Sequence, residues 1–319
     1  MIGAALKSLS QPYLDLSLRS GPDLRVRIVE RPGLWMEQAA LEALCADLRH
    51  VASKTLAAGG LTYGVFSGDA TRLRETIVTL VTRTDGTPVA FNALAIMQVD
   101  TQPRPTEVLH LGLVMVDPDE RSKHLSWVLY GLTCFLIFFR KQFRPLWVSN
   151  VTQVPAVVGM VSTMFSDVWP QPQTIADAPR RTLTHQLLAR RIMANHRGVF
   201  GVGPEAGFDE ARFVITNAYT GGSDDLKKTF EVAAKHRDTR FNDFCVAQLD
   251  YVRGDDLIQL GRMDLPAIRT YLSREVPKSA VIGLLLTGGM VALRRLILPL
   301  IYWSDSRKDW SILRRAGGS

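Results

Sequence analysis

The sequence predicts a mixed α/β protein of the α+β class, in which a mostly antiparallel central sheet is flanked by helices. Residues 77–82 and 89–99 are rich in β-branched and apolar side chains and flank Asp85-Gly86, a pair typical of hairpin turns. Residues 108–116 follow as a nearly all-apolar run, which is typical of a strand covered on both faces. We therefore expect a meander whose last strand lies at the centre of the sheet.

Strand and helix periodicities surround this meander. Residues 24–29 alternate between basic and apolar side chains and predict a strand, whereas leucines at three- and four-residue steps predict a helix over 34–51. Asp69 is a candidate cap for a further helix before the meander. The elements expected after it are helices over 125–139, 153–165, 182–195 and 224–236, and strands over 146–149, 212–218 and 245–252.

The composition limits the class of protein. The chain has 319 residues, of which 46% are hydrophobic, enough to bury one sizeable core and an accessory region. The formal charge of +7 comes from basic residues spread along the sequence, and they form no basic arm, so nucleic-acid binding is not predicted. The three cysteines are far apart and form no C-x-x-C pair, which argues against a disulfide framework and against a metal site.

The most specific motif follows the central strand and reads Val116-Asp117-Pro118-Asp119-Glu120-Arg121-Ser122-Lys123-His124-Leu125-Ser126. It resembles the loop V-x-P-x-x-[QR]-x-x-G-x-[GA] of the GNAT superfamily of N-acyltransferases, and the element order over residues 24–165 resembles that family too. In the family this loop binds the pyrophosphate of coenzyme A through backbone N–H groups at a helix start. The resemblance implies acyl-CoA as co-substrate, bound by Val114, Val116, Arg121, Ser122, Lys123, His124, Leu125, Ser126 and Asn150.

The loop departs from the family at His124, which replaces a glycine. A side chain at that position restricts the approach of the backbone, so the loop either holds the coenzyme less closely or accepts the phosphodiester of an acyl carrier protein. Residues 117–120 are also of types that favour the first turn of a helix. A helix cap without a role in coenzyme binding therefore stays open as the alternative.

Amine acylation needs a group that accepts the ammonium proton. Many members of the family use a glutamate on the central strand, and His110 occupies that place when counted back from Arg121. Because imidazole titrates near neutral pH, His110 is the first candidate base and Glu107 the second. Asn150, the third candidate in the catalytic group, matches a polar position that contacts the pantetheine arm, although a turn-forming asparagine explains it equally well. No tyrosine follows in the next helix, so the acid that protonates the thiolate is unassigned.

The stretch over residues 280–303 is the most apolar of the chain. Arg294-Arg295 and Pro299 interrupt it, so neither half reaches the roughly 20 residues that span a bilayer. A segment in the membrane interface fits better, with a buried helix or a dimer interface as the alternative. No secretory signal is recognisable. We therefore expect a cytoplasmic protein that binds peripherally to the inner face of the cytoplasmic membrane.

These observations divide the chain into an acyl-CoA-binding domain over 1–175, a second mixed region over 176–275 that is open to acceptor binding, and an apolar, basic, membrane-associated segment over 276–319. The expected function is transfer of an acyl group, above all a long-chain fatty acyl group, from acyl-CoA to the amine of a lipid-like acceptor. A sphingoid base, as used by the bacterial ceramide synthases, is one such acceptor. The alternatives are a soluble acetyltransferase of a small amine or protein and a non-catalytic acyl-CoA-binding protein.

Overall fold

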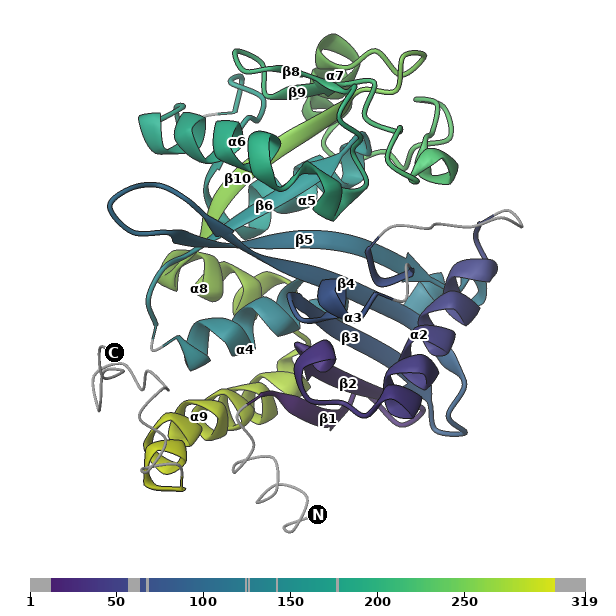
Figure 1. Cartoon of the computed structure of the whole chain (residues 1–319), viewed down its shortest axis with the longest axis vertical. Helices are drawn as coiled ribbons and strands as arrows, with labels where there is room; N and C mark the ends of the chain where they lie inside the picture. Colours follow the sequence, from purple (N-terminus) through teal and green to yellow (C-terminus); the bar gives the residue numbers. More distant parts are fainter. Residues whose placement is uncertain are drawn as a thin grey trace.

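The structure, a computed structural model, describes residues 13–56, 64–66, 69–123, 125, 127–141, 143–175 and 178–301, and these contain one ten-stranded open sheet. The strands are β1 (Asp15–Arg19), β2 (Leu24–Glu30), β3 (Thr76–Arg83), β4 (Pro88–Val99), β5 (Thr106–Val116), β6 (Leu146–Thr152), β7 (Ser166–Trp169), β8 (Gly207–Asp209), β9 (Val214–Thr216) and β10 (Asp256–Met263). Their order is β1-β2-β3-β4-β5-β6-β10-β9-β8, and β7 also pairs with β10. Among these described strands β5 and β6 run parallel and the other pairs are antiparallel, which confirms the predicted mixed class (Figure 1).

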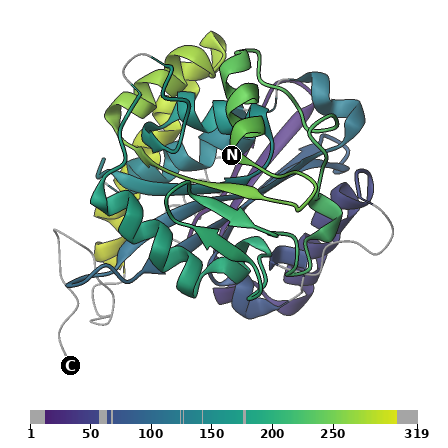
Figure 2. The ribbon, with the colours of Figure 1, turned by 90° about the horizontal axis from the view of Figure 1, so that it is seen from above.

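Helices cover both faces of this sheet. They are α2 (Gln38–Ser53), α3 (Ala70–Leu73), α4 (Thr133–Arg140), α5 (Pro155–Met164), α6 (Leu183–Asn195), α7 (Thr239–Gln248), α8 (Leu265–Arg274) and α9 (Lys278–Ile301). α2 and α6 pack on one face, against alternate residues of β4 such as Phe91 and Met97. α4, α5, α8 and α9 pack on the other face, against Leu94 and Ile96. From above, the purple helix α2 and the yellow helix α9 lie on opposite sides of the strands (Figure 2).

The first half of the chain follows the predicted order of elements. The β3–β4 hairpin turns at Asp85-Gly86, where the glycine has a φ of 93° that favours a residue without a Cβ. Asp69 caps α3, since its carboxylate accepts a hydrogen bond from the N–H of Thr71 at 2.7 Å. β5 lies in the middle of the strand order, as the apolar run predicted.

Residues 224–236 do not form the predicted helix. A 3₁₀ turn, Asp224–Leu226, is followed by irregular backbone. The carbonyl of Leu226 accepts a hydrogen bond from the side chain of Gln153 at 3.2 Å, and Ala233 is the one buried residue in the segment. Helices in proteins are stabilised mainly by burying an apolar face, and this segment buries none.

Residues 245–252 do not form the predicted strand. Residues 245–248 end α7, whose Phe241 and Cys245 are buried one turn apart.

β10 and α8 come next and were not predicted. Polar residues inside β10 mask its strand pattern, although the strand is almost entirely buried. β10 belongs to the predicted region 176–275 yet pairs with β6. The division of the chain into three parts stays a prediction.

The strand predicted over residues 212–218 is shortened to β9. Phe213 and Asn217 flank it with φ angles of 59° and 54°, which are left-handed conformations incompatible with an extended strand. The pattern located the strand, but local backbone geometry sets its ends.

The helix predicted over residues 125–139 starts with a π turn. Trp127–Leu132 is π-helical and leads into α4. Tyr271 of α8 holds this turn, because its hydroxyl donates to the carbonyl of Trp127 at 2.9 Å. A Cβ at Gly131 would lie 2.0 Å from the Tyr271 ring, so the glycine is needed for α8 to pack here. π turns occur frequently at functional sites.

The apolar C-terminal stretch forms α9, which continues through positions 294, 295 and 299, whose side chains lie outside the described part, as do residues 302–319. Leu284 and Val291 are buried in the cluster beneath α4. The described helices include none long and apolar enough to cross a membrane. The outer side of α9 carries exposed apolar side chains, namely Ile282, Leu285, Leu286, Leu293, Leu296 and Leu300.

β5 and β6 are paired over only part of their lengths. Their parallel register runs from Val108 and Trp147 to His110 and Ser149, and then stops. Beyond this point β5 stays paired with β4, whereas β6 stays paired with β10. The two central strands therefore separate beyond His110.

A β-bulge accompanies this separation. The register of β4 with β5 shifts between Ala93 and Ala95, so that Leu111 and Gly112 lie opposite a single residue of β4. A Cβ at Gly112 would lie 2.0 Å from the carbonyl oxygen of Ala93, and a backbone atom cannot move aside as a side chain can. The bulge therefore requires glycine at this position.

Gly112→Ala is expected to destabilise the protein by about 2 kcal/mol, because it overpacks the bulge. Gly283→Ala on α9 is the matched control, since no atom lies within 4 Å of its added Cβ and alanine is the better helix former. Urea denaturation of both variants measures the difference. A Gly112→Ala protein as stable as the wild type would contradict this geometry.

Candidate functional site

A cavity of about 640 Å³ lies where β5 and β6 separate. Small-molecule sites typically have volumes of roughly 300–1,000 Å³. Residues 110–116 of β5 and residues 150–154 at the end of β6 line it, and side chains from both helix layers complete it. The cavity therefore has one side towards α4 and α5 and another towards α2 and α6.

Four of the predicted coenzyme-contacting residues line this cavity: Val114, Val116, Leu125 and Asn150. The two valines pack with the apolar cluster of α4. Asn150 donates through Nδ2 to Oε1 of Gln259 at 3.3 Å, and Gln259 in turn donates to the carbonyl of Pro170 at 3.0 Å. This chain of amides orients Asn150 on the α5 side of the sheet.

The motif loop forms a 3₁₀ helix, Pro118–Lys123. Asp117 caps it by accepting a hydrogen bond from the N–H of Asp119 at 3.0 Å. Glu120 is buried beside the cavity, and Arg83 donates to its carboxylate at 2.6 Å. The side chains of Arg121, Ser122 and Lys123, and the residues His124 and Ser126, lie outside the described part of the chain. Phosphate binding by this loop stays a prediction.

Tyr130 lines the cavity from the π turn and was not predicted. Its hydroxyl has no hydrogen-bond partner within the described residues. Burial raises the pKa of Tyr130 to about 12, so the phenol is protonated at neutral pH and able to donate. The family's tyrosine acid would lie in the helix after Asn150, whereas Tyr130 belongs to the helical segment before β6.

His110 lies on the side of the cavity that α2 and α6 cover. Its Nδ1 is 3.0 Å from Oγ of Ser149, and its ring lies 5.1 Å from that of Phe200 between centroids. A serine hydroxyl both donates and accepts, so it is compatible with either tautomer. Burial lowers the pKa of His110 to about 4, so the imidazole is neutral at pH 7. The near-neutral pKa that suggested this residue is therefore absent.

Glu107, the second candidate base, does not line the cavity. Its carboxylate is 2.8 Å from Nζ of Lys141 and also accepts a hydrogen bond from Gln98 at 3.3 Å. The structure thus places Glu107 in an ion pair outside the site.

Asp256 is a carboxyl group of the cavity that was not predicted. It begins β10, is 5% exposed, and accepts a hydrogen bond from the hydroxyl of Tyr219 at 2.8 Å. Burial raises the pKa of Asp256 to about 7, although the bond from Tyr219 acts in the opposite direction. A carboxylate that titrates near the working pH is suited to general-base catalysis.

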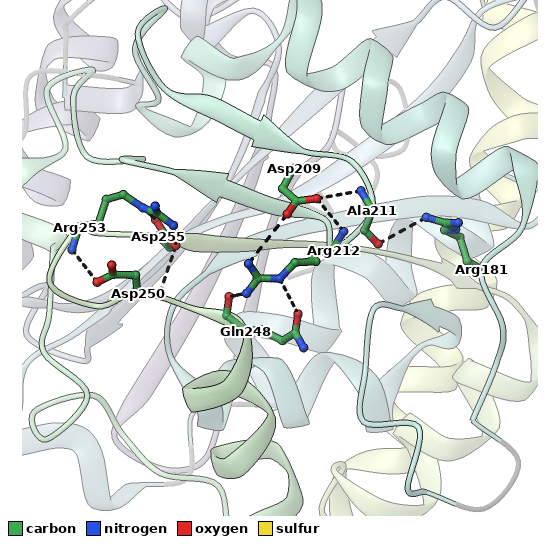
Figure 3. Close-up of polar contacts among 8 residues, drawn as sticks. All are labelled: Arg181, Asp209, Ala211, Arg212, Gln248, Asp250, Arg253 and Asp255. Atoms are coloured by element: carbon green, nitrogen blue, oxygen red, sulfur yellow. Dashed lines mark hydrogen bonds and ion pairs between the residues drawn. The ribbon is translucent and has the colours of Figure 1, made fainter.

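The neighbouring Asp255 is in a different environment (Figure 3). Arg253 donates to both of its carboxylate oxygens at 2.7 Å. Burial disfavours the ionised form of Asp255, but the bonds from Arg253 and from backbone N–H groups outweigh this and lower its pKa. Asp255 is thus held by Arg253 directly before β10 begins, whereas Asp256, the first residue of the strand, lines the cavity.

Thr152 and Leu257 form the last pair of the antiparallel ladder between β6 and β10. Gln153 follows Thr152 and Asp256 precedes Leu257, so Gln153 and Asp256 are neighbours at the end of this ladder. Its Nε2 donates to the carbonyl of Leu226 at 3.2 Å, which fixes the orientation of the amide because a carbonyl can only accept. Its Oε1 is buried without a partner within the described residues. An unpaired buried acceptor costs about 1–3 kcal/mol, which a bound donor would offset.

Neither a protein-family model nor a curated protein matches the chain. The described residues contain no group of His, Cys, Asp and Glu side chains placed to hold a metal ion. The cavity and its side chains are therefore the basis for assigning a function.

Asp256→Asn is expected to alter how stability depends on pH. The folded protein keeps the Asp256 proton up to about pH 7, whereas the unfolded chain releases it near pH 4. Because the folded pKa is raised, wild-type stability falls as pH rises through this window, by about 3 kcal/mol between about pH 5 and about pH 8. The variant lacks this loss. Urea denaturation at both pH values checks the prediction, and parallel pH dependence in the two proteins would contradict it.

Proposed function

We propose that the protein is an N-acyltransferase that moves an acyl group, above all a long-chain fatty acyl group, from acyl-CoA to the amine of a lipid-like acceptor. The observation that carries this proposal is the cavity at the separation of β5 and β6, which side chains from both faces of the sheet line. A thioester on one face and an amine on the other would meet at such an opening. Holding two reactants in this way supplies much of the rate enhancement of a bimolecular transfer.

The element order supports the same proposal. β2, α2, α3, β3, β4, β5, α4, β6 and α5 follow one another in the order that the GNAT resemblance implies. The motif loop begins at the end of β5, next to the cavity. In this proposal the coenzyme lies on the α4 and α5 side, with its pantetheine arm along Val114, Val116 and Asn150.

The transfer forms a C–N bond and breaks a C–S bond, so the amine must lose a proton and the thiolate must gain one. Tyr130 is protonated at neutral pH and lies on the proposed donor side, where it is suited to protonate the thiolate. The bulge at Leu111 and Gly112 leaves a residue out of the strand ladder, and its backbone is suited to stabilise the oxyanion. His110 contributes a neutral, hydrogen-bonding ring on the acceptor side.

The outer side of α9 supports a membrane-derived acceptor and contact with a membrane surface. Ile282, Leu286 and Leu300 are 73%, 71% and 75% exposed. Together with the other exposed leucines of α9 they recur at helical spacing, so they form one stripe. Exposed apolar patches of this kind mark interaction surfaces, and an amphipathic helix buries such a stripe in a membrane interface.

The wild-type protein is expected to release free thiol from palmitoyl-CoA in the presence of a long-chain amine, and to release less from acetyl-CoA. Tyr130→Phe should lower kcat about 100-fold with little change in the donor KM, because it removes a proton donor and little binding surface. Tyr13→Phe, which removes a hydroxyl outside the cavity, is the control.

Each outcome of this thiol assay is informative. Preference for acetyl-CoA would favour an acetyltransferase of a small amine, and no release from any donor would contradict acyl transfer. An unchanged kcat in Tyr130→Phe would remove this residue from the proposal.

Vesicle sedimentation tests membrane contact. Wild-type protein should bind vesicles of equal parts phosphatidylcholine and phosphatidylglycerol, and the double variant Leu286→Glu, Leu293→Glu should bind at least about tenfold less, because it puts charge in the apolar stripe. Val246→Glu is the control, since Val246 is 54% exposed on α7. Unchanged binding by the double variant would contradict this role of α9.

A further inference from the structure

The acceptor side of the cavity holds two neighbouring hydrogen-bond acceptors. Asp256 and Gln153 both line it and are 5% and 1% exposed. One is a carboxyl group, and the other presents an amide oxygen without a partner among the described residues. Two buried acceptors side by side are matched by a ligand that supplies two donors.

Both side chains belong to the face that α6 covers. Ile258 packs in the α6 cluster, and Asp256 lies two residues before it on the same strand. Val151 packs against the same cluster, and Gln153 lies two residues after it. Side chains two apart along a strand share a face, so Asp256 lies on the same side of the sheet as His110. Gln153 follows the last residue of β6, and its amide reaches Leu226, which packs with the cluster of α2 on that same side.

We infer that Asp256 and Gln153 form the acceptor subsite, in which Asp256 binds the ammonium group and takes its proton while Gln153 accepts a hydrogen bond from the same molecule. This inference rests on the proposed acyl transfer. The matching acceptor is a primary amine with a hydroxyl on the adjacent carbon, which offers two donors close together. A plain alkylamine offers only its ammonium group, so Asp256 and Gln153 must share the N–H donors of one nitrogen, whereas the hydroxyl of the amino alcohol donates to Oε1 of Gln153 separately. An α-amino acid brings a carboxylate against Asp256.

Tyr219 is a positioning residue for Asp256. Its hydroxyl donates to Oδ1, which leaves Oδ2 without a partner among the described residues and available to the ammonium group. The cavity is also lined by Arg72, Glu75, Glu120, Tyr130, Asp225 and Lys228. The groups next to Asp256 are Asp255 and Tyr251, with His110 across the cavity. Asp255 is paired with Arg253, Tyr251 donates to the carbonyl of Gln153, and His110 is neutral, so none of them takes the proton at neutral pH.

The chemical balance is that of amide formation. The ammonium nitrogen loses one proton to the carboxylate of Asp256 and regains its lone pair. The nitrogen then bonds to the thioester carbon, the C–S bond breaks, and the thiolate takes a proton from Tyr130. The second surplus proton of the nitrogen restores the phenol of Tyr130 through water. Asp256 returns its proton to water.

Amine binding tests the subsite without turnover. Calorimetry with an aminodecanol whose amine and hydroxyl are on adjacent carbons, and with decylamine, should show about tenfold tighter binding of the amino alcohol by the wild type. Gln153→Leu should abolish this preference. Asp256→Asn should weaken binding of both amines at least about tenfold. Asp224→Asn, an exposed carboxylate outside the cavity, is the control and should bind like the wild type.

Kinetics test the proton transfer. Asp256→Asn should lower kcat/KM at least about 100-fold. Tyr219→Phe removes a bond that holds the pKa of Asp256 down, so the acidic limb of the kcat/KM profile should move to higher pH while the plateau changes little. A purely structural role of Tyr219 would instead lower the rate at every pH.

The two proposals fail in different ways. Amine binding and thiol release that are unaltered in Asp256→Asn would overturn the acceptor subsite while acyl transfer stands. Amine binding that depends on Asp256, with no thiol release from any acyl donor, would overturn acyl transfer while the binding subsite stands. Equal wild-type affinity for the two amines would overturn the role of Gln153.

Discussion

The parallel ladder between β5 and β6 ends at His110 and Ser149, and the candidate site depends on this ending. β6 is held on its other edge by β10, and β5 is held by β4 through a bulge that requires Gly112. Neither strand can therefore follow the other beyond the last pair. Backbone groups that leave a ladder need other partners, and here they border a cavity large enough for a ligand.

Burial inside this cavity has opposite effects on two titratable groups on the α6 side, His110 and Asp256. It lowers the pKa of His110 to about 4 and raises the pKa of Asp256 to about 7, because low polarity disfavours whichever form is charged. The histidine is therefore neutral at physiological pH, whereas the aspartate titrates there. A buried carboxyl group such as that of Asp256 lowers the stability of the folded protein. Groups with strongly shifted pKa values are typical of functional sites.

Local patterns predicted the first half of the fold, because the hairpin at Asp85-Gly86 and the apolar β5 are specified by short stretches of sequence. Counting back along β5 also placed His110 at the cavity, but its lowered pKa follows from burial that no local pattern reports. Asp256 was missed because β10 reaches β6 from far along the chain and carries buried polar residues that resemble a loop. Tyr130 was missed because the acid was sought in the helix after β6, whereas a π turn presents it before that strand.

A crystal structure with a non-hydrolysable thioether analogue of acyl-CoA tests the central claim most directly. The account predicts that the thioether sulfur lies between β5 and β6 just beyond the pair formed by His110 and Ser149, with the pantetheine arm along Val114 and Asn150. An analogue bound elsewhere on the molecule, with no atom between the two strands, would contradict it.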